Sequence, residues 1–283
     1  MLTQQLTASI VIHNSPRLQV VRALLCLLIT PVNTIYLIDN GDDTSLAFLA
    51  GYSPRIRYIH VENRGFGAGH NNALKEILKD PDGFHLVMNA DVCWDGDILT
   101  PLVSYLENNQ DVGMVMPKVM YPDGDLQYTC RMLPTPFDLF LKRFLPAKIT
   151  RKRMERYLLA SHDHDKPLNC PYLLGSFLLF RNKALKDCGI FDERFFMYPE
   201  DIDITRRIHE KWKTMYHPAV TIIHEHAAAS RHSGKMLRIH LTNMVKYFNK
   251  WGWLFDKQRR QFNRQLLNSI TPIPPEQRPP GRG

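Results

Sequence analysis

The sequence predicts an α/β fold in which helices cover a mostly parallel sheet, with a basic helical extension near the C-terminal end. Two observations support this expectation. In the first half of the chain, short β-branched runs alternate with amphipathic stretches of helical length, separated by short loops rich in Asn, Asp and Gly. A long basic and aromatic stretch of helical character lies near the end. Strand–helix alternation is typical of parallel sheets because the helices form the crossovers.

The elements of the first half are predicted in a regular order. Strands are expected at residues 8–13, 34–38, 57–61, 84–88 and 112–116, and helices at residues 18–29, 71–79 and 98–108. The second half is less regular. There we expect a buried strand bent at Gly175 over 172–181, a helix over 201–212, a short strand over 219–223 and a helical region over 235–267.

The composition is that of a globular protein, with 44% hydrophobic and 23% charged residues. A net charge of +8 indicates an anionic partner, which could be nucleic acid, an acidic membrane surface or a phosphorylated substrate. Five scattered cysteines without a C-x-x-C pair favour reduced thiols in a cytosolic protein. No signal peptide is expected, and the apolar stretch at 20–30 is too short to span a bilayer. Any membrane contact is therefore expected to be peripheral.

Polar side chains follow four of the predicted strands. These are Asn14, Asp39, Asn63 and Asp91. Ligands of parallel α/β sheets bind beyond the carboxyl ends of the strands. The sequence therefore predicts one site built from these residues.

The tripeptide Asn89-Ala90-Asp91 ends the fourth predicted strand. A carboxylate there can hold Mg²⁺ or Mn²⁺ against a diphosphate, because hard cations prefer oxygen ligands and often share them with substrate phosphates. The alternative is an Asx turn that begins the next segment. The tripeptide alone does not decide between them.

The glycine-rich segment from Arg64 to His70 lies between a predicted strand and a predicted helix. Backbone N–H groups at such a junction can bind phosphate. A dinucleotide-binding loop is the alternative, since Asp91 follows about twenty residues later. Against it, the loop follows the third strand and its spacing is G-x-G-x-G.

Two further motifs carry candidate chemistry. Glu200 and Asp201 begin a predicted helix, where either could act as a general base, although acids are also stabilised there by the exposed N–H groups. His224-Glu225-His226 lacks the H-E-x-x-H spacing of zinc proteases. His224 could instead complete a metal–diphosphate site, or be an ordinary surface histidine.

In order along the chain, from about Ala8 to Ser230, these segments resemble the inverting family 2 glycosyltransferases, which have the GT-A fold. The resemblance is greatest to the rhamnosyltransferase-like branch that builds O-antigen and other bacterial cell-surface glycans. It is carried by ASIVIHN, LIDNGDD, NRGFGAGHNNAL, MNADV, LLGSFLLFRNKALKDCGIFDERFFMYPEDIDITRRI and HPAVTIIHEHAAASR.

The resemblance implies a role for each candidate residue. The nucleotide would be bound by His13, Asn14, Asp39 (on the base), Asn63, Arg64, Gly65, Gly67, His70, Asn71, Asn89 and Asp91. Asp91 would also bind the metal, with His224 as a second contact to metal or diphosphate. Asp201 would be the catalytic base, with Glu200 beside it on the acceptor side, and Gly175 and Ser176 would line the donor sugar and the acceptor.

The resemblance also implies domains, a cofactor and partners. The GT-A domain would span 1–232, with a nucleotide-binding half at 1–117 and an acceptor-binding half at 118–232. A basic aromatic helical extension (233–268) and a disordered Pro-rich tail (269–283) would follow. The cofactor would be Mg²⁺ or Mn²⁺, although Asn89 replaces the first acid of D-x-D. The Q-x-x-R-W element of processive members is absent, which favours addition of a single sugar.

The favoured donor is dTDP-rhamnose, and the favoured acceptor is a lipid-diphosphate-linked saccharide at the inner face of the cytoplasmic membrane. Peripheral attachment to an anionic membrane surface is expected, and nucleic acid is not. Two alternatives stay open: a nucleotidyltransferase or dinucleotide-dependent enzyme on a similar sheet, and a basic module that binds nucleic acid or membrane.

Overall fold

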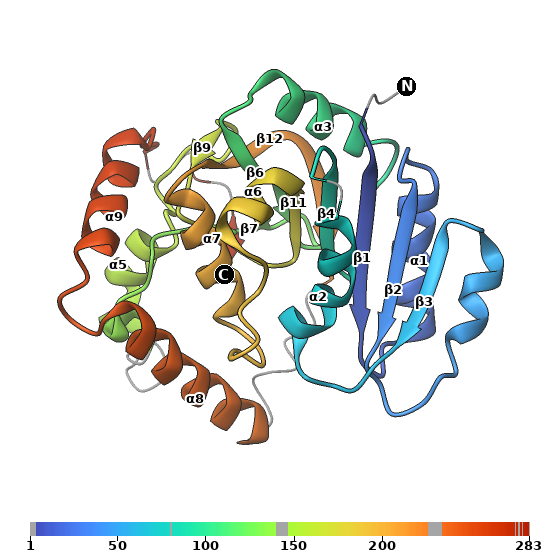
Figure 1. The fold of residues 1–283 in the computed structure, drawn as a ribbon. Coiled ribbons are helices and arrows are strands. Elements are labelled where there is room, and N and C mark those ends of the chain that lie inside the picture. The colour runs from blue at the N-terminus through green and yellow to red at the C-terminus, as the bar shows by residue number, and fades with distance from the viewer. Residues whose placement is uncertain are drawn as a thin grey trace.

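A computed structural model of the protein (Figure 1) describes residues 4–79, 81–139, 147–225, 234–274, 276, 278 and 280–282. An 11-stranded sheet runs through it, in the order β13-β7-β6-β11-β4-β1-β2-β3, with β12 beside β6. The predicted α/β fold with a mostly parallel central sheet is confirmed. His226 and residues 140–146 lie outside the described residues.

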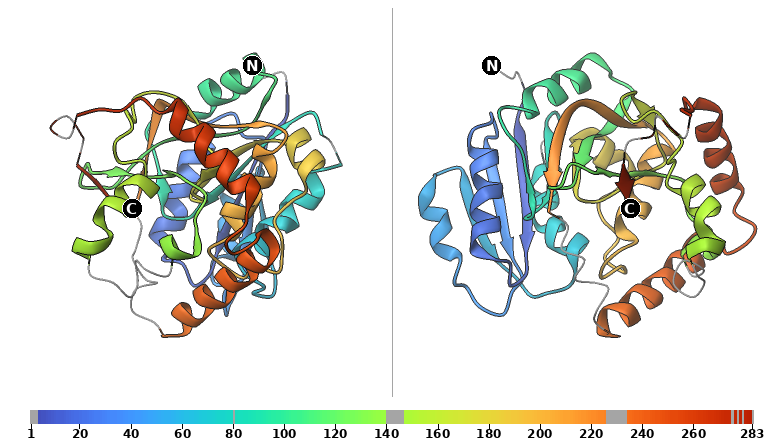
Figure 2. Two further views of the ribbon diagram at one scale, coloured as in Figure 1. Left: turned by 90° about the vertical axis from the view of Figure 1, so that its left-hand side faces the viewer. Right: turned by 180° about the vertical axis from the view of Figure 1, so that it is seen from behind.

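The first half of the sheet is parallel. It consists of β1 (Leu6–Ile12), β2 (Thr34–Asp39), β3 (Ile56–His60) and β4 (Phe84–Asn89). Strand β1 is buried at almost every position because helices cover both faces, which explains its continuous apolar sequence. Figures 1 and 2 show α1 (Arg17–Leu28) and α2 (Phe66–Ile77) on opposite faces. A 3-10 turn (Ala47–Tyr52) precedes β3, and α3 (Leu99–Asn108) follows β4.

An antiparallel strand joins the two halves of the sheet. Strand β11 (Phe177–Arg181) pairs antiparallel with both β4 and β6 (Val112–Met120). The long β12 (Lys213–His224) then runs parallel to β6, with a register shift between His217 and Thr221. The short strand predicted at 219–223 is therefore the last part of a 12-residue strand.

The remaining strands are two residues long. They are β5 (Val92–Cys93), β7 (Leu126–Gln127), β8 (Cys130–Arg131), β9 (Leu168–Asn169), β10 (Tyr172–Leu173) and β13 (Gly281–Arg282). The predicted bend at Gly175 separates β10, which pairs with β8 in a second small sheet, from β11 in the main sheet. Helices α6 (Asn182–Cys188) and α7 (Glu200–His209) follow β11.

Three helices flank the second half: α5 (Ala147–Tyr157), α8 (Gly234–Trp251) and α9 (Lys257–Ser269). The helical region predicted at 235–267 is thus two helices. The break falls at Gly252, whose φ of +100° favours glycine, and the Asp256 side chain caps α9 by accepting from the Arg259 N–H. No described helix combines the length and apolarity needed to cross a bilayer.

A buried ion pair fastens α9 to α7. Both terminal nitrogens of Arg206 lie 2.7 Å from the carboxylate oxygens of Asp256, and both side chains are buried. The domain boundaries, including disorder after residue 268, stay predictions. In the structure, β13 pairs with β7, so two residues of that tail extend the main sheet.

Candidate functional site

A cavity of about 380 Å³ opens at the carboxyl ends of β1, β2 and β4. Its lining includes five residues predicted to bind the nucleotide: His13, Asn63, Gly65, Asn89 and Asp91. Phe196 and Met197, which precede α7, and Met236 and Ile239 from α8 also line it. A larger cavity of about 520 Å³ lies elsewhere, between α5 and α9, and has no acid in its lining. The smaller cavity is therefore the candidate catalytic cleft.

The end of β4 and the end of β12 bring Asp91 and His224 together. The His224 Nε2 lies 3.2 Å from the Asp91 Oδ1 and 3.5 Å from the Asn89 Nδ2. The backbone holds the two residues in contact, because His224 pairs with Val92 in the β5–β12 ladder and the Glu225 N–H donates to the Asp91 carbonyl. Two residues 133 positions apart in the sequence thus form one polar cluster at the cleft.

Gln127, which the sequence analysis did not single out, orients His224. Its Oε1 lies 2.8 Å from the His224 Nδ1, and both side chains are buried. An amide oxygen only accepts hydrogen bonds, so Nδ1 carries the proton. In the neutral ring the Nε2 lone pair then faces the Asp91 carboxylate. A ring nitrogen and a carboxylate oxygen at this separation fit a divalent cation held by Asp91 and His224.

Asp39 lies at the edge of the cleft with both carboxylate oxygens engaged. Its Oδ2 accepts from the Tyr58 hydroxyl at 2.7 Å and its Oδ1 accepts from the Gly41 N–H at 2.9 Å. Burial, followed by this bond to Asp39, raises the pKa of Tyr58 well above its usual value. Asp39 is itself buried, so a bound base would meet a carboxylate that is already fixed in orientation.

Asn14 and Asn63 organise the loops around the cleft. The Asn14 amide bonds the Asp42 carboxylate at 2.7 Å and accepts from the Asp42 N–H, which holds the loop after β2. The Asn63 Oδ1 accepts from the Asn40 side chain at 3.3 Å and from the Gly65 N–H at 3.1 Å. Of the two, only Asn63 lines the cavity.

The glycine-rich segment packs against the acceptor half. Gly65 has φ +102°, and a Cβ there would lie 2.1 Å from the Phe196 carbonyl oxygen. The Phe66 N–H donates to that same oxygen at 3.0 Å. A side chain at Gly67 would likewise lie 2.8 Å from the Phe191 Cβ. Glycine is needed here for a close approach between the two halves.

His70 and Asn71 differ from the expectation that they lie along the nucleotide. Because α2 begins at Phe66 rather than near residue 71, both fall in its second turn and are buried. The His70 Nδ1 lies 2.7 Å from the Ser9 hydroxyl, and the Asn71 amide donates to the Phe191 carbonyl at 2.9 Å. Arg64 is exposed and faces Glu193 at 4.0 Å. None of the three lines the cavity.

Asp201 lies beside the cleft but does not line it. The Asn89 N–H donates to the Ser176 carbonyl at 3.0 Å, and the neighbouring Gly175 N–H donates to the Asp201 Oδ2 at 3.0 Å. The Asp201 Oδ1 accepts from the Ile202 N–H at 2.8 Å. The expected meeting of Asp39, Asp91, Asp201 and His224 is therefore only partly realised: Asp91 and His224 touch, while Asp39 and Asp201 flank them with their oxygens on protein donors.

The pKa values of Glu200 and Asp201, at the start of α7, are raised. Burial raises the pKa of Asp201 to about 6, opposed by the N–H groups of Gly175 and Ile202 and by the charge of Arg131. Burial and then the Asp201 charge raise the pKa of Glu200 well above its usual value, and the Glu200 Oε2 has no hydrogen-bond partner among the described residues. Tyr198, just before them, has φ +91°, a strained conformation of the kind found near functional sites.

The model of the family described as "Glycosyl transferase family 2" matches residues 9–189, which contain Asn89, Asp91, Gly175 and Ser176. The chain belongs to glycosyl transferase family 2. The resemblance read from the sequence is thereby confirmed, and the protein is a glycosyltransferase.

This family 2 glycosyltransferase is similar to two rhamnosyltransferases. It is 29% identical to the N-acetylglucosaminyl-diphospho-decaprenol L-rhamnosyltransferase of Mycobacterium tuberculosis over 212 residues, 69% of this chain and 67% of the relative. It is 25% identical to the rhamnosyltransferase WbbL of Escherichia coli over 216 residues, 74% of this chain and 79% of the relative.

Solved structures share its fold. GalNAc-T7, crystallised with UDP, GalNAc and Mn²⁺, superposes with a TM-score of 0.62 at 13% identity over 92% of this chain. The chain spans about half of GalNAc-T7, 49% of its length. Residues 1–349 of Staphylococcus aureus TarS in complex with UDP superpose with a TM-score of 0.56 at 14% identity, covering 94% of this chain and 71% of the other. At these identities the likeness shows the GT-A fold.

Proposed function

We propose that this glycosyltransferase moves a single L-rhamnose, with inversion, from dTDP-rhamnose to a hydroxyl of a lipid-diphosphate-linked saccharide. The observation that carries the proposal is the Asp91–His224 pair at the end of β4, held by Gln127 at the mouth of a cleft large enough for a nucleotide. The donor and acceptor are supported by the two rhamnosyltransferase relatives, one of which is named for an N-acetylglucosaminyl-diphospho-decaprenol substrate.

Asp91 and His224 would hold the divalent cation, Mg²⁺ or Mn²⁺. When bound, the cation neutralises charge on the donor diphosphate. Asn89 supplies an amide rather than a second carboxylate, so Asp91 is the only acid that this tripeptide offers. The ring orientation set by Gln127 keeps the Nε2 lone pair of His224 directed at the cation position beside the Asp91 carboxylate.

The nucleoside would lie over the ends of β1 and β2. Asp39, buried behind the cavity lining, would accept a hydrogen bond from the base, while His13 and Asn63 line the cavity. The fixed carboxylate of Asp39 suits this role because its orientation costs little entropy on binding.

Asp201 would accept the proton of the acceptor hydroxyl. As that oxygen forms its bond to the anomeric carbon, the bond from this carbon to the diphosphate oxygen breaks on the opposite face. One displacement gives inversion, and no protein nucleophile is needed. A base with a pKa of about 6 is ionised at neutral pH yet basic enough to receive a proton. Glu200, protonated beside it, adds no second negative charge.

The acceptor requires a site of action at a membrane. We place the enzyme in the cytoplasm, attached peripherally to the anionic inner face of the cytoplasmic membrane. The basic helices α5 and α9 support this placement, because anionic lipid attracts clustered Lys and Arg side chains.

Thermal melting with nucleotide sugars tests the proposal. dTDP-rhamnose should raise the melting temperature more than UDP- and GDP-sugars, and more with Mn²⁺ than without it, because a ligand at 100 times its Kd stabilises the folded state by about 2.7 kcal/mol. Transfer is then assayed on polyprenyl-diphosphate-linked N-acetylglucosamine. Stabilisation by a nicotinamide cofactor but by none of the sugars would overturn the proposal.

A further inference from the structure

The larger cavity, of about 520 Å³, lies on the outer side of the second half, between α5, the loop at 132–137 and α9. It shares no lining residue with the catalytic cleft. Figures 1 and 2 show α5 and α9 side by side at the edge of the molecule, away from the parallel strands β1 to β3. Nothing in the glycosyl transfer described above uses this cavity.

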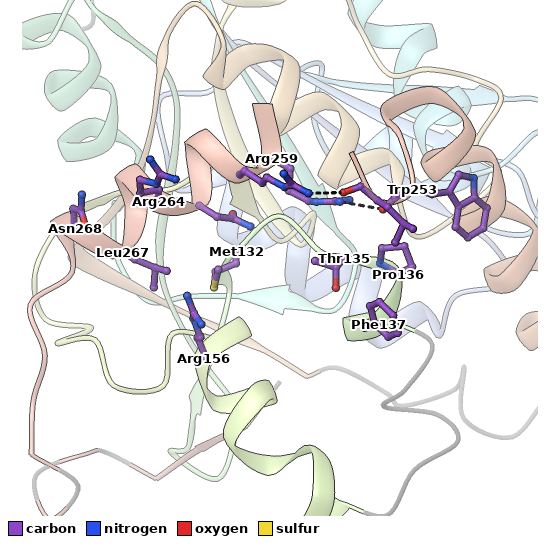
Figure 3. Close-up of a pocket in the computed structure, with 13 residues that line it drawn as sticks. Met132, Thr135, Pro136, Phe137, Arg156, Trp253, Arg259, Arg264, Leu267 and Asn268 are labelled. Atoms are coloured by element: carbon purple, nitrogen blue, oxygen red, sulfur yellow. Dashed lines mark hydrogen bonds between the residues drawn. The ribbon is translucent and has the colours of Figure 1, made fainter. Parts of the chain in front are cut away.

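The cavity is strongly cationic. Arg156 from α5 and Arg260 and Arg264 from α9 line it, all three exposed, and no Asp or Glu is among its described lining residues. Figure 3 shows Arg156 reaching from α5 toward Met132, on the side of the cavity that faces α9. Within the part of the chain that the structure describes, none of the three arginines forms an ion pair. Their charges are therefore available to an anionic ligand.

Two other arginines near the cavity are engaged with protein oxygens. Arg259 is buried and donates to the Trp253 carbonyl at 3.0 Å, and Arg153 lies 2.6 Å from Asp138. Helix α9 carries four basic residues and no acidic one. The only acid of α5, Glu155, faces Arg151 at 3.7 Å. Together with the exposed Lys148, Lys152 and Lys257 of the same two helices, the three arginines make this face of the protein cationic.

An exposed apolar turn borders the cavity. Between α8 and α9, Trp253, Leu254 and Phe255 leave 39%, 56% and 86% of their surface exposed, and Trp253 and Leu254 line the cavity. Phe137, on the opposite rim, is 52% exposed. Aromatic and aliphatic side chains flanked by arginines are typical of proteins that insert into the boundary between lipid headgroups and acyl chains.

We propose that the arginine cavity between α5 and α9, together with the Trp253–Phe255 turn, binds the phosphate headgroups of anionic phospholipids and docks the enzyme on the membrane. The inference rests on the proposed function, whose membrane-bound acceptor requires such a surface. Arg156, Arg260 and Arg264 hold the headgroup phosphates, and the turn enters the apolar layer. Helix α8 connects this surface to the cleft, since Met236 and Ile239 near its start line the cleft and Trp253 follows its end, about 27 Å away along the helix.

Sedimentation with vesicles tests this docking surface. The full chain, without donor or acceptor, is mixed with vesicles of phosphatidylcholine alone or with an equal amount of phosphatidylglycerol. The wild type should bind only the anionic vesicles. Replacing Arg156, Arg260 and Arg264 together by Gln should weaken that binding about 100-fold, because each cation near the surface contributes about fivefold.

Matched variants separate this site from general charge. Changing Lys79, Lys183 and Lys186 together to Gln removes the same charge from exposed positions just after α2 and on α6, outside the cavity, and should leave vesicle binding close to that of the wild type. Phe255→Ser removes apolar surface without changing charge, and should also weaken binding. Melting temperatures of all variants establish that they fold.

Three results would overturn the inference. They are equal binding of the wild type to neutral vesicles, undiminished anionic binding by the triple arginine variant, and arginine-dependent stabilisation by inorganic phosphate with no vesicle binding. Stabilisation by dTDP-rhamnose is measured on the same variants and should be unchanged. A failure of docking is thereby distinguished from a failure of the proposed transfer.

Discussion

The imidazole of His224 and the carboxylate of Asp91 stand 3.2 Å apart, although they come from the ends of β12 and β4. The Gln127 Oε1 contacts the other ring nitrogen, so one amide oxygen and one carboxylate oxygen fix the orientation of the ring. A site of this kind presents nitrogen and oxygen lone pairs to one point. The contact is the basis of the first two predictions.

Asp91→Asn should abolish the effect of Mn²⁺ on donor binding, because the only carboxylate of the tripeptide is lost. Melting temperatures with dTDP-rhamnose, with and without Mn²⁺, measure this. Asp95→Asn, a nearby exposed acid, is the matched control and should behave as the wild type. Equal metal dependence in Asp91→Asn and wild type would show that the cation binds elsewhere.

Gln127→Leu should weaken metal-dependent donor binding about 10- to 100-fold, the usual loss when a partner behind a ligating histidine is removed. The leucine keeps the volume but leaves the His224 Nδ1 without its acceptor. Titration of Mn²⁺ in the presence of donor gives the apparent affinity. Gln110→Leu, at an exposed glutamine after α3, is the control. If both variants titrate alike, Gln127 has no positioning role.

Asp201→Asn should reduce the rate of transfer by about 10² to 10⁴, the range for loss of a general base. Donor binding should persist, since Asp201 does not line the cleft that holds the donor. Single-turnover transfer and donor-dependent melting are measured in parallel. Glu200→Gln should cost less, because the raised pKa of Glu200 favours the uncharged form that Gln resembles. An active Asp201→Asn enzyme would remove Asp201 from the mechanism.

The pH profile should show an acid limb. Asp201 must be ionised to accept a proton and its pKa is raised to about 6, so kcat/KM should fall as pH drops below about 6. The charge of Arg131 opposes that rise, and the pKa of Tyr172 is raised well above this range. Arg131→Gln should therefore move the limb to higher pH and Arg131→Lys should leave it nearly in place. An unchanged limb in Arg131→Gln would contradict the assignment to Asp201.

Arg206→Leu should destabilise the protein by about 3–5 kcal/mol, because it leaves the buried Asp256 carboxylate without its partner at the start of α9. Urea unfolding gives the free energy. The exposed pair of Lys213 and Asp111 supplies the control, since Lys213→Gln should cost no more than about 1 kcal/mol. A small loss in Arg206→Leu would mean that water reaches Asp256.

Much of the fold was predictable because its signals are local. The runs that became β1, β2, β3 and β4 are short and apolar, and each ends in polar residues, so their order and the position of the cleft followed from the sequence. His70 and Asn71 were placed differently because the glycines before them suggested a loop, whereas the helix begins at Phe66. Close packing of Gly67 against Phe191, 124 positions later, has no local signal.

The partners behind the site were not predictable for a similar reason. Gln127 belongs to a two-residue strand and meets His224 across 97 positions of sequence. Asp201 reads as an exposed acid at a helix start, and only the packing of Tyr172, Gly175 and Arg131 around it reveals burial. The sequence located the acids but not the environment that sets their proton affinity.

The contact between Gly65 and the Phe196 carbonyl limits how this enzyme can be redesigned. No side chain fits at that point, so libraries that vary the glycine-rich segment would separate the donor half from the acceptor half before changing what either recognises. Efforts to alter donor preference are better directed at His13 and Asp39, where substitution leaves the joint between the halves intact.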